Sequence, residues 1–343
     1  MASTDPGSAA EGRRSASHGV TRWIRARLQA REAGLFVALL VTMVVLTLLS
    51  PNFASVGNLL TVGRNASEVG IIALGMTVVL IVAHVDLSVG AVYASGGIAA
   101  GLTLVATGSF ALSMAAGIAV GLLVGAVNGV LVGFVGLNSF MVTLATLGIV
   151  RGVTVIATGG TTVSISGQGV PSDQLDLFRL LGAKLPGGIN TQFLTLLLLV
   201  LVMTWLLRAT KPGFMAYAAG GNPEAARIAG IRVPLVIIGA FMVSGALAAL
   251  AGIMAISFVG SMNPATGSGL EFDVFAAAVI GGASLSGGRG SMFGTLLGAL
   301  FLSVARNGFI LLGVTAFAQE VAIGLIILVA IGVDRWVTIR QST

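Results

Sequence analysis

Residues 208–232 read RATKPGFMAYAAGGNPEAARIAGIR, a polar stretch with a long apolar run on each side. Within it, Asn222 can cap a helix, Pro223 suits the first helical position and Glu224 complements the positive end of the helix dipole. Gly230 is placed to end that helix about two turns later. Because the stretch is polar, we expect this helix to lie outside a membrane. So short a helix is marginal in water on its own, and we therefore expect it to bind a partner.

The composition around this stretch indicates the class of protein. Hydrophobic residues make up 56% of the chain and charged residues 9%, whereas a soluble domain carries about 25% charged residues. We therefore expect an integral membrane protein surrounded by membrane lipid. Cysteine is absent and the two histidines are far apart in sequence, so the sequence predicts no metal site.

Ten apolar runs follow a basic tail at residues 1–33, and most approach the ~20 residues that cross a bilayer. The runs lie at about 34–50, 67–84, 87–107, 110–135, 139–157, 192–207, 234–259, 272–285, 291–313 and 319–336. This pattern predicts an all-α polytopic protein with about ten transmembrane helices. The short run at 272–285 leaves nine or eleven as alternatives.

The basic residues predict how these helices are oriented. Most of the 18 Lys and Arg residues lie in the tail or in loops on its side of the bilayer. The positive-inside rule then places both termini and the segment 208–233 in the cytoplasm, and the loop 158–191 outside. We expect the tail at 1–33 to be disordered and residues 34–338 to form one transmembrane domain. This orientation explains the net charge of +6, so nucleic-acid binding is not expected.

Glycines spaced four residues apart form a ridge on the run at 110–135 and again on the run at 291–313. They are Gly117, Gly121, Gly125, Gly129 and Gly133, then Gly290, Gly294 and Gly298. Such ridges predict close packing of a neighbouring helix rather than a substrate site. A weak similarity between Asn58–Gly90 and Thr266–Gly290 also indicates a possible internal repeat.

The motifs of an enzyme are missing from the sequence. It contains no Gly-x-x-x-x-Gly-Lys-[Ser/Thr] phosphate loop, no Ser/His/Asp arrangement and no His-Glu-x-x-His. We expect no catalytic residue and no cofactor in this chain. A transporter of this kind must then draw on an ion gradient or on a separate ATPase.

Polar residues in or beside the apolar runs are candidates for a solute pathway or for structural roles. Asp86 precedes the run at 87–107, where capping is favoured over proton transfer. Arg151 lies deep in its span and is either an internal tie or a pathway contact. Arg306 also lies within a span and has the same two possible roles. Its nearest acid in sequence is Glu320. The pathway candidates, whose hydroxyl and amide groups suit a neutral hydroxylated solute, are Asp86, Ser88, Asn138, Ser139, Thr143, Thr146 and Arg151.

Four motifs in order also carry a resemblance to a known family. They are Val85-Asp-Leu-Ser-Val-Gly-Ala, Asn138-Ser-Phe-Met-Val-Thr-Leu-Ala-Thr-Leu-Gly with Arg151-Gly152, Gly220-Gly-Asn-Pro-Glu-Ala-Ala-Arg-Ile-Ala-Gly-Ile, and Ala277-Ala-Val-Ile-Gly-Gly-Ala-Ser-Leu-Ser-Gly-Gly-Arg-Gly-Ser. Over about residues 35–336 the chain resembles the permease subunit of ribose-type ABC sugar importers. The resemblance implies a permease of the bacterial inner membrane that translocates a monosaccharide delivered by a periplasmic sugar-binding protein.

The resemblance also implies partners for the segment 208–233. A cytoplasmic ABC ATPase subunit, which holds the ATP and Mg, would dock on it, and a second permease copy or paralogue would complete the pathway. The coupling residues implied are Asn222, Pro223, Glu224, Ala225, Ala226, Arg227 and Gly230. Two departures from the family pattern, Ala83-His84-Val85 for a typical Gly-Gly-Ile and Arg306 for a typical Asn, put the substrate in doubt.

Other functions stay open at this point. A proton-coupled secondary transporter of a small neutral solute, working through Asp86, Glu271 or Glu320, is the main alternative. A passive channel comes next, followed by an intramembrane hydrolase built on His84 and Asp86. Uptake that needs ATP, an ATPase subunit and a binding protein would separate the first hypothesis from these.

Overall fold

The computed structural model describes residues 32–166, 169–315, 317–326, 328–329 and 332. The predicted disorder of the tail at 1–33 therefore falls almost wholly outside the described residues. The first described helix is Glu32–Leu49. The labelled elements that follow are α2 (Val56–Ile81), α3 (Val89–Thr107), α4 (Phe110–Gly133), α5 (Ser139–Thr158), β1 (Val163–Ser164), α6 (Ser172–Leu180), α7 (Thr191–Ala209), α8 (Lys211–Gly221), α9 (Pro223–Ile228), α10 (Val233–Val259), β2 (Ser261–Met262), α11 (Leu270–Ile280) and α12 (Met292–Leu311).

This architecture is all-α and polytopic, as the sequence predicts. Eight described helices are long and apolar enough to cross a membrane: Glu32–Leu49, α2, α3, α4, α5, α7, α10 and α12. The run at 272–285 forms only the 11-residue α11, which at 1.5 Å per residue is too short to cross the ~30 Å hydrocarbon layer alone. The run at 319–336 is described in part, as the apolar helix Phe317–Ile326.

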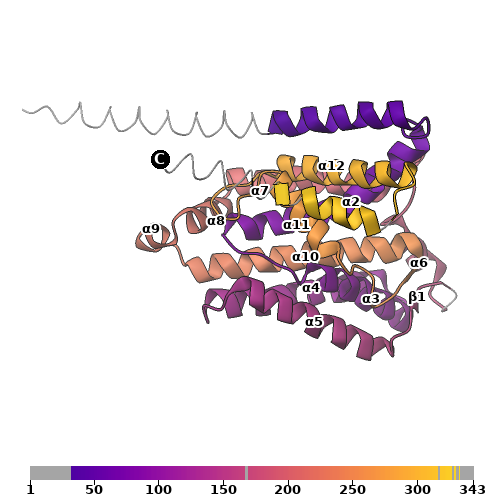
Figure 1. Cartoon of the computed structure of the whole chain (residues 1–343). Coiled ribbons are helices and arrows are strands. Elements are labelled where there is room, and N and C mark those ends of the chain that lie inside the picture. Colours follow the sequence, from indigo (N-terminus) through magenta and orange to yellow (C-terminus); the bar gives the residue numbers. More distant parts are fainter. Residues whose placement is uncertain (1–31, 167–168, 316, 327, 330–331, 333–343) are drawn as a thin grey trace, which may run out of the picture.

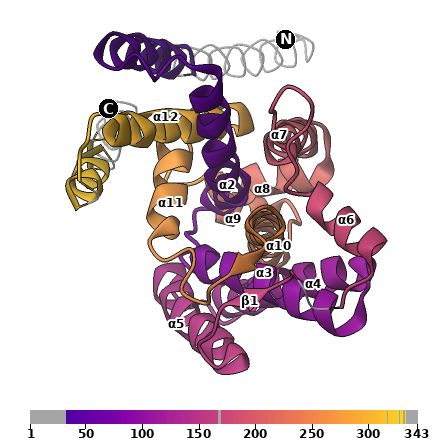
Figure 2. The same ribbon diagram turned by 90° about the vertical axis from the view of Figure 1, so that its right-hand side faces the viewer.

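Helix α10 forms the centre of the bundle, packed against α4, α3 and α2 (Figure 2). The predicted glycine ridge of α4 makes this possible, because a Cβ at any of its five glycines would come within 3.0 Å of a neighbouring helix, α10 in most cases. In the second ridge, Gly294 and Gly298 of α12 pack in the same way on α11 and its C-cap, whereas Gly290 precedes α12 and faces α2. Both predictions of close helix packing are confirmed, and the small residues let the backbones approach.

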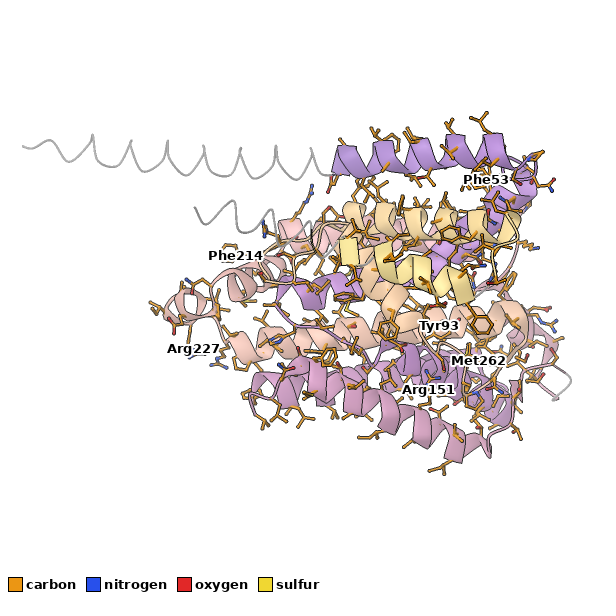
Figure 3. All side chains as sticks on the ribbon, in the orientation of Figure 1. Phe53, Tyr93, Arg151, Phe214, Arg227 and Met262 are labelled. Atoms are coloured by element: carbon orange, nitrogen blue, oxygen red, sulfur yellow. The ribbon has the colours of Figure 1, made fainter. Side chains whose placement is uncertain are left out.

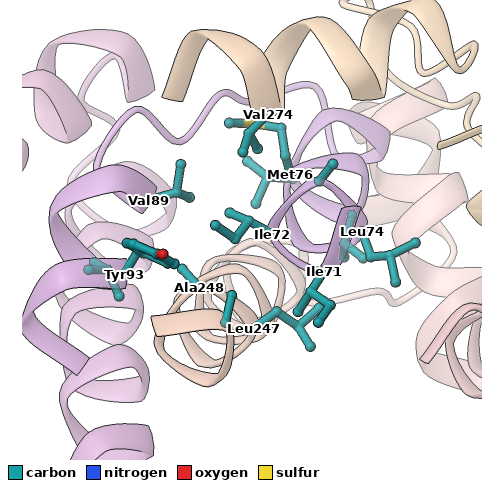
Figure 4. Packing of buried hydrophobic residues seen from close by; sticks show 14 of the residues in the cluster. Ile71, Ile72, Leu74, Met76, Val89, Tyr93, Leu247, Ala248 and Val274 are labelled. Atoms are coloured by element: carbon teal, nitrogen blue, oxygen red, sulfur yellow. The ribbon is translucent and has the colours of Figure 1, made fainter. Parts of the chain in front are cut away.

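The apolar core lies where α2, α3, α10 and α11 meet. Ile72 and Met76 of α2 face Tyr93 of α3, Ala248 of α10 and Val274 of α11 there (Figure 4). These side chains are at most 4% exposed. The four helices therefore form one rigid unit around which the other helices are arranged.

The bundle has two ends, which we name by the elements they carry. Helices α8 and α9 lie at one end, and α6 and β1 lie at the other (Figure 1). At the β1 end, β1 pairs with β2 in antiparallel register, Val163 opposite Met262, which ties the loop after α5 to the end of α10. At the α9 end, the loops 82–88 and 281–291 meet α8.

Candidate functional site

The segment 208–233 forms two helices that lie beyond the spans at the α9 end. In α9, Asn222 is the N-cap and its Oδ1 accepts a hydrogen bond from the N–H of Ala225 over 2.9 Å. Pro223 and Glu224 occupy the first turn, and Gly230, with φ +84°, follows the last turn. The local predictions for this helix are confirmed, because the Asn222 side chain caps its start and the positive φ of Gly230 suits its end.

Helix α9 presents apolar as well as charged surface. Ile228 is 89% exposed, whereas Ala226 is buried against the bundle. Arg227 lies at the extremity of the structure, far from Arg151 and Met262 (Figure 3). Helix α9 thus offers one exposed apolar side chain beside its charged residues.

Helix α8 connects this exposed helix to the membrane bundle. Tyr217 Oη donates a hydrogen bond of 2.8 Å to the carbonyl of Gly290, and burial raises the pKa of its phenol. Gly220 lies so close to the carbonyl of Ile81 that a Cβ would overlap it. The same carbonyl accepts the N–H of Gly288 over 2.8 Å. Thus α8 rests on the end of α2, where the loop 82–88 begins, and on the loop 281–291.

Asp86, in the first of these loops, is the centre of a buried polar cluster. Its Oδ1 accepts the N–H and hydroxyl of Ser88, over 3.0 and 2.5 Å, and its Oδ2 accepts the hydroxyl of Ser244 over 2.9 Å. Ser88 Oγ in turn accepts Asn128 Nδ2, and Asn128 Oδ1 accepts the hydroxyl of Thr146. The carboxylate thus ties the loop after α2 to α4, α5 and α10.

The other candidates on α5 have partners in the chain as well. Asn138 caps α5 by accepting the N–H groups of Phe140 and Met141. Ser139 Oγ accepts the N–H of Val85 over 3.3 Å, and the Thr143 hydroxyl donates to the Ser139 carbonyl over 2.8 Å. These groups hold the start of α5 against the loop 82–88.

Arg151 lies apart from this cluster, towards the β1 end. Its Nη1 donates to the carbonyl of Ala265 over 3.0 Å and to the hydroxyl of Ser268. It therefore ties α5 to the loop between β2 and α11.

A second set of charges lies where α11, α12 and the helix Phe317–Ile326 meet. Arg306 Nη2 is 2.8 Å from Asp273 Oδ1 and 3.4 Å from Glu320 Oε1. Glu320 was the acid nearest in sequence, and the structure adds Asp273, which is the closer and more buried partner. Glu271, nearby, accepts the N–H of Gly269 with one oxygen over 3.3 Å.

Sequence reasoning missed three parts of this arrangement. Ser244 gives one weak signal, a hydroxyl in the middle of the very apolar α10. Tyr217 looks like an interfacial aromatic residue, and its partner is a backbone carbonyl. The contact between Ile81 and Gly288 involves only main-chain atoms, so the residue types at these positions do not predict it.

Comparisons with known proteins agree with this architecture. The family described as branched-chain amino acid transport system / permease component matches residues 58–331. The ribose import permease of Escherichia coli K12 is 37% identical over 299 residues, 87% of this chain and 92% of the relative. That of Bacillus subtilis 168 is 38% identical over 306 residues, 89% and 93%. The autoinducer 2 import system permease of Salmonella typhi is 35% identical over 298 residues, 87% and 84%.

These matches are all described as permease components of transport or import systems. The family match begins within α2 and takes in the segment 208–233 and every labelled helix after α2. The chain belongs to the family of permease components of binding-protein-dependent import systems, and it is a relative of the ribose import permeases.

Proposed function

We propose that this chain is the permease subunit of an ATP-driven monosaccharide importer, in which a periplasmic binding protein delivers the sugar. The observation that carries the proposal is α9, a self-capped helix with an exposed Ile228 that α8 connects to the bundle. An ABC ATPase subunit docks there and supplies ATP and Mg, and a second permease copy or paralogue completes the pathway. This chain itself holds no cofactor and no catalytic residue.

The orientation follows from the distribution of charge. The segment 208–233 carries Arg208, Lys211, Arg227 and Arg232 against the single acid Glu224. The positive-inside rule puts this end, and with it both termini, in the cytoplasm. The β1 end then faces the binding protein, and docking of that protein involves the loop 158–191.

The substrate class rests on the relatives. The family description refers to branched-chain amino acids, whereas the relatives quoted above are named for ribose and autoinducer 2. We favour a monosaccharide because the ribose permeases match almost their full length. The hydroxyls of Ser88, Ser139, Thr143 and Thr146 already have partners in the chain, so we assign them a bracing role around Asp86 rather than a solute-binding one.

The test is uptake into proteoliposomes that contain the permease, the ATPase subunit and the binding protein. Labelled ribose and leucine are compared, each with ATP inside and with a pH gradient alone. We expect sugar uptake only with ATP and all three components. Uptake by the permease alone under a pH gradient would instead support the proton-coupled alternative, which would use Asp86, Glu271 or Glu320.

A matched pair of variants tests the docking role of α9. Glu224→Lys reverses the acid in its first turn, and the control Asn52→Lys places a lysine in the exposed turn before α2, outside both proposed docking segments. We expect only Glu224→Lys to separate ATP hydrolysis from uptake while the permease stays folded. Equal uptake by both variants would contradict docking at α9.

A further inference from the structure

A cavity of about 530 Å³ lies between α7, α8 and α10 at the α9 end of the bundle. Leu207 of α7, Met215 of α8, and Val236 and Ala240 of α10 contribute to its walls. The cavity is partly open to the surface, and its volume lies in the ~300–1,000 Å³ range of ligand pockets. We therefore expect the cavity to bind a ligand.

The lining restricts the chemistry of that occupant. Of the side chains that line the cavity, all within the described part of the chain, only Arg232 is charged, and the others are apolar or glycine. A second cavity of about 510 Å³ lies on the other side of the connection between α9 and α10, and it shares Arg232 and adds Arg227. The occupant must thus combine an apolar body with an anionic group held near Arg232.

The position of the cavity identifies a source for such a molecule. Helices α7 and α10 are membrane spans, so the parts of their surfaces that no other helix covers face acyl chains. Gly239 of α10 lines the cavity, and a Cβ at this position would meet no atom within 4 Å. The wall is therefore open where a side chain would ordinarily close it.

We propose that the cavity is a binding site for an anionic phospholipid, with an acyl chain between α7 and α10 and its phosphate headgroup on Arg232. Basic residues near the membrane surface attract anionic lipids. The lipid contacts α8 through Met215 and the first turns of α10 through Leu235 and Val236. It thereby stabilises the position of α8, which carries α9, relative to the central helix.

The test counts bound lipid by native mass spectrometry on the full-length chain, purified in detergent and offered phosphatidylglycerol and phosphatidylethanolamine. We expect wild type to retain one phosphatidylglycerol in preference to phosphatidylethanolamine. Arg232→Gln should lower that preference about five-fold, the effect of removing one basic residue at a membrane surface. Gly239→Leu, which fills the cavity from α10, should abolish retention of both lipids.

Gly34→Leu is the matched control, because Gly34 is also an exposed glycine in a membrane span with open space around it. It should retain lipid as wild type does. If Gly239→Leu does not fold, Leu235→Trp fills the cavity from its half-exposed rim. Equal lipid retention by wild type and a filled variant would overturn the proposal. A wild-type chain that carries no phospholipid would overturn it too, and would leave the cavity to a partner protein. Lipid counting needs no transport, so its failure is distinct from failure of the uptake assay.

Discussion

The N–H of Gly288 donates a 2.8 Å hydrogen bond to the carbonyl of Ile81, and this bond joins the last residue of α2 to the loop after α11. Gly220 of α8 packs on the same carbonyl. Seven residues beyond it in sequence, Arg227 belongs to the exposed α9. Five residues beyond Ile81, Asp86 anchors the polar cluster. A displacement of α9 can therefore be transmitted to the centre of the bundle, because the main-chain contacts between them are too close to be compressed further.

The first prediction concerns the glycine at this contact. Gly220→Ala places a methyl group on the carbonyl of Ile81, and we expect overpacking to cost about 1–3 kcal/mol of stability together with a loss of ATP-driven uptake. The control is Gly221→Ala, whose Cβ would have its nearest neighbour 3.9 Å away. Thermal unfolding and proteoliposome uptake measure both effects. If the two variants behaved alike, α8 would not depend on this contact.

A second prediction concerns the hydrogen bond from Tyr217 to Gly290. Tyr217→Phe removes it, and we expect a loss of about 1 kcal/mol, the net value of one such bond. Burial raises the pKa of this phenol, while the nearby Arg208 partly opposes the shift. The neutral phenol is thus favoured in the folded protein. Its contribution to the free energy of unfolding is therefore complete below about pH 10, the ordinary pKa of tyrosine, and is lost as the pH rises further.

That pH dependence distinguishes Tyr217 from a merely apolar contact. Unfolding of wild type and Tyr217→Phe, compared at neutral pH and above pH 10, should show a difference that shrinks as the pH rises. A difference that stays constant over this range would mean that the phenol does not titrate with folding.

The third prediction concerns Asp86. Asp86→Asn can keep its oxygen at the Oδ1 position, where it accepts both the N–H and the hydroxyl of Ser88, and the Ser244 hydroxyl can rotate to accept from the new amide. We therefore expect Asp86→Asn to fold and to retain at least about half of ATP-driven uptake. Asp86→Leu should fail, because it leaves three buried donors without an acceptor, at roughly 1–3 kcal/mol each. Loss of uptake in a folded Asp86→Asn chain would favour proton transfer through this carboxyl.

The fourth prediction concerns the ion pair at 2.8 Å between Arg306 and Asp273. Arg306→Ala leaves a carboxylate that is 8% exposed without its partner. We expect a loss of about 2 kcal/mol, below the value for a fully buried pair because Arg306 is partly exposed. Glu320→Ala, at the more exposed and longer contact, should cost less than about 1 kcal/mol.

Thermal unfolding of Arg306→Ala, Glu320→Ala and the double variant Arg306→Ala with Asp273→Asn checks this assignment. The double variant should recover part of the lost stability, because the unpaired charge is gone. No recovery in the double variant would indicate that Arg306 acts through packing alone.

Local features of this protein could be predicted from the sequence because their causes are local. Asn222 caps α9 with its own side chain, and the glycines of α4 mark a packing face wherever the partner lies. The length of each run of apolar residues is also a local feature, and it predicts most of the membrane-spanning helices. The exception is the run at 272–285, where apolar character continues past Ile280 but the backbone turns, with Gly282 at φ +99°, Gly287 at φ +77° and Gly288 at φ +69°.

The sequence by itself determined that the chain is a helical membrane protein, where most of its spans lie, and which short helix lies outside them. Only the tertiary structure decided which polar groups meet: Asp86 with Ser244, Arg306 with Asp273, and the carbonyl of Ile81 with Gly288. The physical reason is that hydrophobic length and helix capping act over one or two turns. A buried polar group, by contrast, takes whichever partner the packed helices bring within about 3 Å, and that partner can be far away along the chain.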